Sequence, residues 1–292
     1  MLDWKFYSAV VFVCVAVGSF LYKRAQMLGI RSGSFMVVQS FCFFCTVLAA
    51  SLIRYGGVSS SPYPWLALVA GALGMTGAFS VLQSMRQGEL GTNIAVVRLS
   101  FIPTAIGAFL FLGEPFTVQK GLLLLLAGLA VSLFFDHYRR ENRLALKSLV
   151  PAMTACMAFG VFDVIYKIAS THGVNPLTFL IVQSATAHIL INLYVALHEK
   201  YQLNRVVFRI APLCGILFAA ACLSMLKALE EVDVSLISPL IQMNFILSYV
   251  MGVVFLGESV TKRKLLGITI VALCVLLLSE DLYQRLFGPW IG

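Results

Sequence analysis

Three charged side chains lie inside long apolar stretches of this sequence. Arg98 follows Ala-Val-Val and precedes Leu-Ser-Phe-Ile-Pro, while Asp163 and Lys167 lie four residues apart in a second apolar stretch. A charged residue at the centre of a bilayer costs at least about 2.5–3.5 kcal/mol on insertion scales, so it is normally paired, cavity-facing and functional. These three residues are the first candidates for a functional site.

The chemistry open to these residues differs. The guanidinium of Arg98 can bind a carboxylate or a phosphate through two parallel hydrogen bonds, or it can pair with an acid on another helix. Asp163 is the one carboxylate near the middle of an apolar stretch, which makes it a candidate for proton coupling. Lys167 shares a helix face with Asp163, so it either contacts substrate or forms a structural ion pair.

The elements that position these residues are apolar helices. Hydrophobic residues make up 60% of the 292 and charged residues 12%, about half the charged fraction of a soluble domain, so most of the surface must face lipid. Apolar runs near 20 residues predict an all-α integral membrane protein with ten transmembrane helices. Their expected limits are 6–23, 35–53, 65–85, 92–113, 116–135, 149–170, 177–198, 206–228, 234–256 and 261–280.

The two halves of the chain resemble each other at an offset of 144 residues. Leu-Gly-Glu recurs at 112–114 and 256–258, and Tyr22-Lys23 recurs as Tyr166-Lys167. We therefore predict a first five-helix repeat at 1–135, a basic connecting loop at 136–148 and a second repeat at 149–292. Because five is odd, the repeats should be inverted, which creates a site near the bilayer midplane where the repeats meet.

The repeat extends the list of candidate residues. Gln242 is the equivalent of Arg98, Asn244 lies beside it, and Gln83 and Lys227 occupy equivalent places near span ends. We predict substrate contacts from Arg98, Gln242, Lys167, Tyr166, Tyr22, Asn244, Gln83 and Lys227. We predict coupling or gating roles for Asp163, Lys23 and His188.

Four polar residues at repeated positions are expected to be structural. Amides between membrane helices mostly hold the helices together, and a carboxylate at a helix N-terminus is stabilised by the helix dipole. The four are Gln39, Gln183, Glu114 and Glu258.

Charge and cysteine usage bound the function further. The net charge of +8 comes from basic residues between the apolar runs, which argues against nucleic acid as a partner. Five basic residues fall on the side that holds both termini and fourteen on the other, which predicts the termini outside and the central loop in the cytoplasm. The seven cysteines lie in apolar runs and are expected to pack as hydrophobes. No cofactor and no metal are expected.

The ten spans, the repeat and the paired Leu-Gly-Glu segments resemble the EamA branch of the drug/metabolite transporter superfamily. The segments are FLFLGEPFTVQKGLLLLLAGLAV and GVVFLGESVTKRKLLGITIVAL. The resemblance implies a basket of helices around a cavity lined by spans one, three, four, six, eight and nine. It implies transport, but substrates across the superfamily are too varied to name the cargo.

These observations predict a secondary-active exporter or exchanger that works by alternating access in a bacterial inner membrane. Its substrate is expected to be a small polar or amphipathic metabolite with a carboxylate or phosphate, such as an amino acid, with protons as the coupling ion. The alternatives are a membrane scaffold or a membrane enzyme, although no catalytic grouping is visible and we expect no enzyme activity. A monomer or a homodimer is expected.

Overall fold

The described part of the chain is helical throughout. The structure is a computed structural model, and it describes residues 4–55, 63–86, 88–113, 121–122, 125–126, 128–130, 133, 143–229 and 243–277, among which there is no strand. In order the helices are α1 (Trp4–Met27), α2 (Ser32–Tyr55), α3 (Pro64–Ser84), α4 (Leu90–Val97), the 3-10 turn η1 (Arg98–Ser100), α5 (Phe101–Leu112), α7 (Arg143–Thr171), α8 (Pro176–His198), α9 (Arg205–Leu229), α11 (Asn244–Leu256) and α12 (Lys262–Leu277).

Seven helical segments within the described ranges are long and apolar enough to cross a membrane. They agree with predicted spans one to four and six to eight, with α4, η1 and α5 forming one segment. α7 starts at Arg143, six residues before the expected limit of 149, so part of the predicted connecting loop is helical. Most of predicted span five and the first residues of span nine lie outside the described residues.

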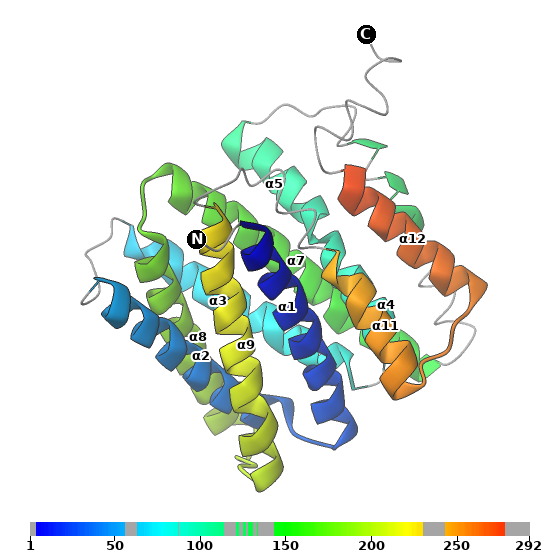
Figure 1. The fold of residues 1–292 in the computed structure, drawn as a ribbon, viewed down its shortest axis with the longest axis horizontal. Coiled ribbons are helices and arrows are strands. Elements are labelled where there is room, and N and C mark those ends of the chain that lie inside the picture. The colour runs from blue at the N-terminus through cyan, green and yellow to red at the C-terminus, as the bar shows by residue number, and fades with distance from the viewer. Residues whose placement is uncertain are drawn as a thin grey trace.

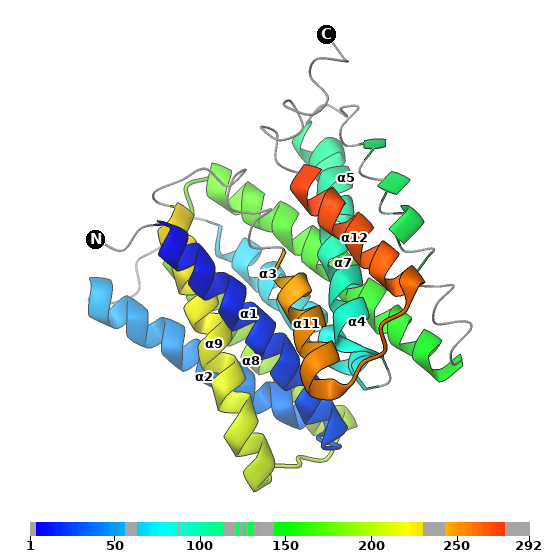
Figure 2. The ribbon, with the colours of Figure 1, turned by 45° about the vertical axis from the view of Figure 1, so that its right-hand side comes forward.

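The helices pack in pairs that the 144-residue offset exchanges. α3 lies along α7 as α1 lies along α9, and α2 contacts α9 as α8 contacts α3 (Figure 1). α5 contacts α7 as α11 contacts α1. In both views α2 lies at one edge of the bundle and α12 at the opposite edge (Figures 1 and 2). Each of these helix pairs therefore has an equivalent pair at the same offset.

Close helix contacts repeat the same symmetry. A Cβ added at Gly71 would lie 2.6 Å from the backbone oxygen of Gln183, and one added at Gly215 would lie 2.5 Å from that of Gln39. Small residues at such crossings let two membrane helices approach closely. Both glycine–glutamine pairs map onto each other with an offset of 144 residues.

The equivalent helices α2 and α8 run antiparallel. Ser40 contacts His188 at 2.9 Å, while Val47, further along α2, packs in one apolar cluster with Leu180, which precedes His188 in α8. Equivalent helices of opposite direction are what an inverted pair of repeats requires.

Basic and polar turns gather at one end of the bundle. Arg31, between α1 and α2, donates to the carbonyl of Lys200 at 3.1 Å, and the backbone of Gln202 donates to Ser34 at 2.8 Å. Lys23 donates to the carbonyls of Met85 and Gly88 at 3.0 and 2.5 Å, so the α3–α4 connection joins the same group. We call this surface the basic end.

Candidate functional site

The fourth membrane segment is broken at Arg98. The helix changes from α4 to the 3-10 turn η1 at Arg98 and returns to an α-helix at Phe101. Pro103 has no backbone N–H, so it cannot donate to the carbonyl of Leu99 four residues earlier, which favours irregular geometry at this point. A 3-10 turn in the middle of a helix often marks a functional hinge.

The break is held tightly against α7. A side chain at Gly160 would collide with Pro103, and its Cβ would lie 2.7 Å from the carbonyl oxygen of Ser100. The hydroxyl of Thr104 lies 2.9 and 3.2 Å from the carbonyl oxygens of Ser100 and Gly160, which share its one proton. The irregular backbone after Arg98 therefore has a fixed position relative to α7.

Arg98 lacks a close partner in this arrangement. Its Nε is buried and has no hydrogen-bond partner, and its guanidinium makes no ion pair within 4 Å among the residues that the structure describes. Asp163 on α7 is near enough to interact with it electrostatically. A buried guanidinium that is only partly compensated can bind an anion without first breaking a salt bridge.

Asp163 faces the same region from α7. Its carboxylate lies 3.4 Å from the hydroxyl of Thr104, a hydrogen-bond donor, and the residue is exposed on the surface of the helix bundle. Tyr166 lies three residues further along α7, where its ring packs edge-to-face on Phe179 at 4.8 Å. Lys167 is exposed on the same helix. The structure thus brings Asp163 and Thr104 together near Arg98.

Several other predicted site residues have packing roles away from Arg98. Tyr22 is only 3% exposed and accepts a hydrogen bond from Gln39 at 2.6 Å. Lys23 binds the α3–α4 connection, and His188 bridges α2 and α8 through Ser40. Sequence symmetry grouped Tyr22 with Tyr166, but Tyr22 is buried in the core and Tyr166 is half-buried.

The remaining candidates are scattered. Gln83 lines a hollow at the basic end, and Lys227 is half-buried near the end of α9. Asn244 is fully buried at the start of α11, and neither polar atom of its side chain has a partner. Gln183 is half-buried on α8. Gln242 and Glu114 lie outside the described residues.

Glu258 of the second Leu-Gly-Glu segment caps a helix of the other half. Its carboxylate accepts hydrogen bonds from the backbone of Leu90 and, at 3.2 Å, of Gly91, at the N-terminus of α4. Burial raises the pKa of Glu258, while these hydrogen bonds and Lys264 act in the opposite direction. Glu258 was predicted to lie at the start of a helix, and the helix that it caps is α4. The next helix in the chain, α12, begins only at Lys262.

Lys264 is a buried cation that was not among the candidate residues predicted from the sequence. It is 0% exposed, and its Nζ lies 2.5 Å from Glu89 and donates to the carbonyl of Ser259 at 2.7 Å. The signal was available, because Lys264 and Lys120 are repeat equivalents six residues after each Leu-Gly-Glu. A lysine whose only role was to add positive charge to one side of the membrane would not need a fixed, buried position.

A metal site is not evident in the residues that the structure describes. No three His, Cys, Asp or Glu side chains in these ranges gather closely enough to hold an ion. The seven cysteines are free thiols.

The apolar helical segments and the charged residues between them define a multi-pass integral membrane protein. The model of the EamA-like transporter family matches residues 146–280, in the second half of the chain. The predicted resemblance to this transporter family and the expected all-α membrane fold are thereby confirmed.

A solved structure supports the same fold over nearly the whole chain. It is titled "Crystal structure of protein", and the match has a TM-score of 0.64 at 16% identity, covering 94% of this chain and 97% of that one. At this identity the likeness speaks for the fold alone. The search of curated proteins found no significant match.

Proposed function

We propose that this chain is a secondary-active transporter that moves a small metabolite with a carboxylate or phosphate group across the membrane by alternating access. The observation that carries the proposal is the buried, unpaired Nε of Arg98 at the break of the fourth segment. In a low-dielectric interior such a group gains most from an anionic ligand that accepts two hydrogen bonds.

Asp163 supplies the coupling step. Its carboxylate lies near Arg98 and accepts a hydrogen bond from Thr104, so a substrate anion and the ionised carboxylate compete for the same positive charge. Protonation of Asp163 releases that competition, which links substrate binding to proton binding. The proton is therefore the proposed coupling ion.

The two halves provide the mechanical basis. Repeats 1–135 and 149–292 are proposed to act as inverted copies, supported by the exchanged helix pairs and by the antiparallel packing of α2 and α8. Two antiparallel copies permit the inward-open and outward-open states to be near mirror arrangements of one fold. The gathering of basic turns at one end favours termini outside, in a bacterial inner membrane.

The test begins with the ligand. A thermal-shift screen of the purified full-length chain against carboxylate and phosphate metabolites finds compounds that raise the melting temperature, because a ligand of the folded state stabilises it. Uptake of the strongest stabiliser is then measured in proteoliposomes. Arg98→Gln should abolish stabilisation and uptake, and Arg98→Lys should restore only a small part because lysine lacks the planar fork.

Arg24→Gln is the matched control, because Arg24 is an exposed arginine on α1. It should bind and transport as the natural chain does. Normal uptake by Arg98→Gln, with its ligand still bound, would exclude Arg98 as the anion-binding residue.

A further inference from the structure

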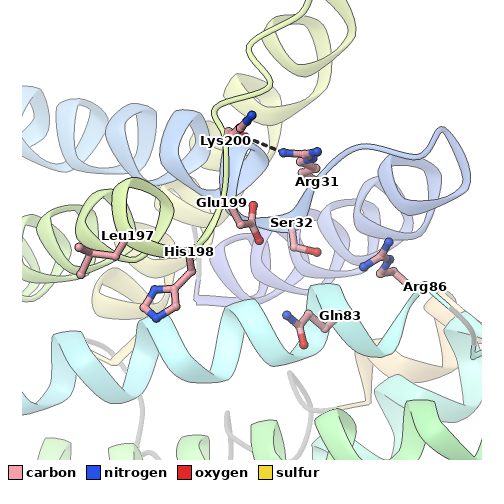
Figure 3. A pocket seen from close by; sticks show the side chains of 8 residues that line it. All are labelled: Arg31, Ser32, Gln83, Arg86, Leu197, His198, Glu199 and Lys200. Atoms are coloured by element: carbon pink, nitrogen blue, oxygen red, sulfur yellow. Dashed lines mark hydrogen bonds between the residues drawn. The ribbon is translucent and has the colours of Figure 1, made fainter.

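A hollow of about 670 Å³ opens at the basic end, apart from the Arg98 region. It lies where the α1–α2 connection, the end of α3 and the end of α8 meet (Figure 3). Its volume is in the range of small-molecule sites. The lining residues are Arg31, Ser32, Gln83, Arg86, Leu197, His198, Glu199 and Lys200.

The hollow is lined by an excess of positive charge. Arg31, Arg86 and Lys200 carry three cations against the single carboxylate of Glu199, leaving +2 with His198 neutral. The guanidinium of Arg31 is oriented by its bond to the carbonyl of Lys200 at 3.1 Å (Figure 3). Among the described residues the side chains of Arg86 and Lys200 have no hydrogen-bond or ion-pair partner, so they are available to a ligand.

Two acceptors buried in the wall of the hollow also lack partners among the described residues. The hydroxyl of Ser32, in a residue 6% exposed, and Oε2 of Glu199 make no hydrogen bond. Gly33 keeps the carboxylate close to α2, since a Cβ there would lie 2.6 Å from Oε2. An unsatisfied buried polar atom is costly, and a ligand that donates hydrogen bonds removes the cost if its binding turns these two groups toward the hollow.

The orientation of the chain in the membrane does not by itself explain why these cations and acceptors line the hollow. The positive-inside rule explains an excess of Lys and Arg at this end, but not a buried carboxylate and hydroxyl among them. The repeat does not account for it either, because Arg31 and Arg86 have Asn175 and Glu230 as their equivalents at the 144-residue offset. The cations therefore belong to this end of the molecule only.

We propose that this hollow binds an aminoalkyl phosphate, with the phosphate at Arg31, Arg86 and Lys200 and the ammonium group at Glu199 and Ser32. Phosphate suits the cations because arginine binds it with two parallel hydrogen bonds, and an ammonium group supplies the donors that the two acceptors lack. The same chemistry occurs in soluble phosphoethanolamine and in the headgroup of phosphatidylethanolamine. The site is independent of the transport function proposed above.

The experiment separates these two sources. The full chain is placed in phosphatidylcholine nanodiscs and titrated calorimetrically with phosphoethanolamine, inorganic phosphate and ethanolamine. Phosphoethanolamine should bind more tightly than either fragment. The double variant Arg31→Gln/Arg86→Gln should weaken the binding of phosphoethanolamine about tenfold or more, because it loses at least one charge-assisted hydrogen bond to the phosphate. Arg24→Gln is the control of equal charge type and should bind normally.

Glu199→Gln tests the orientation of the ligand. It should weaken phosphoethanolamine about tenfold while leaving inorganic phosphate unchanged or tighter, because only the ammonium group uses the carboxylate. For the lipid source, native mass spectrometry of the chain in nanodiscs containing phosphatidylethanolamine should show retained lipid that the double arginine variant loses. Each variant is first checked for an unchanged melting temperature without ligand.

The outcomes are decisive. Tight binding of the soluble compound with no retained lipid assigns a soluble aminoalkyl phosphate, and retained lipid assigns the headgroup. If neither binds, or if the arginine and Arg24 variants behave alike, the proposal fails, whereas uptake through the Arg98 site is unaffected by either result.

Discussion

The hydroxyl of Thr104 lies 3.4 Å from the carboxylate of Asp163, and this contact joins the broken fourth segment to α7. The same hydroxyl also lies within hydrogen-bond distance of the carbonyls of Ser100 and Gly160, so these three acceptors, on the irregular backbone and on the neighbouring helix, share its one proton. A change in the charge of Asp163 therefore acts directly on the segment that holds Arg98. Coupling between two sites needs such a shared element.

Removing the carboxylate should separate transport from its driving force. In proteoliposomes that contain Asp163→Asn, a pH gradient should no longer drive accumulation of the identified substrate, because no group at this position takes up the proton. Counterflow exchange at equal pH should continue, since Arg98 still binds the anion. Both activities are measured with radiolabelled substrate, and pH-driven accumulation at the normal rate would rule out Asp163 as the coupling group.

The crossing of α3 and α8 should tolerate no side chain at Gly71. Gly71→Ala places a methyl group 2.6 Å from a backbone oxygen, which forces the helices apart at a cost of about 1–3 kcal/mol. Gly74→Ala on the same helix meets its nearest atom at 3.7 Å and serves as the control. Melting in detergent, followed by tryptophan fluorescence, should show a lower temperature for Gly71→Ala only.

The repeat equivalent extends this test. Gly215→Ala should lower the melting temperature about as much as Gly71→Ala, because its Cβ would lie 2.5 Å from the oxygen of Gln39. Equal tolerance of alanine at positions 71, 74 and 215 would contradict the observed helix crossings.

Hydropathy was enough to predict the membrane segments, because a helix that crosses the bilayer must be apolar along nearly its whole length. Symmetry was less reliable for side chains. Tyr22 and Tyr166 occupy equivalent positions, yet Gln39 donates to Tyr22 in the core, whereas Tyr166 is half-buried near Asp163 on α7. Such differences in burial depend on neighbours that are distant in sequence, so they cannot be predicted from the periodicity of the sequence.

Long-range polar contacts were likewise beyond the sequence. Glu258 was expected at the start of a helix, but the helix it caps is α4, which begins 168 residues earlier at Leu90. Lys264 lies among other basic residues at the start of the predicted tenth span and is fully buried beside Glu89. Hydropathy ranks both as surface residues, although a charge can be buried when its partners are in place.

The Lys264 ion pair should be strongly destabilised by loss of one partner. Lys264→Met leaves the carboxylates of Glu89 and Glu258 near each other without their cation, and breaking a buried pair in this way costs about 3–5 kcal/mol. Adding Glu89→Gln to Lys264→Met should recover much of the lost melting temperature. A single variant as stable as the natural chain, or no recovery in the double variant, would show that the pair does not hold α4 to the α11–α12 connection.

The glycine that ends α11 should be required for its backbone conformation alone. Gly257 has φ of +66°, and no atom lies within 4 Å of a Cβ built there, so Gly257→Ala meets strain without any clash. A left-handed conformation costs a non-glycine residue about 1–2 kcal/mol, and the melting temperature should fall accordingly. Gly128→Ala is the control, since Gly128 is helical and equally open, and alanine is favoured over glycine in a helix. Its melting temperature should stay level or rise. A fall for both variants would mean that the loss reflects general sensitivity to substitution, whereas a fall at position 257 only assigns it to the turn that places Glu258 against the N-terminus of α4.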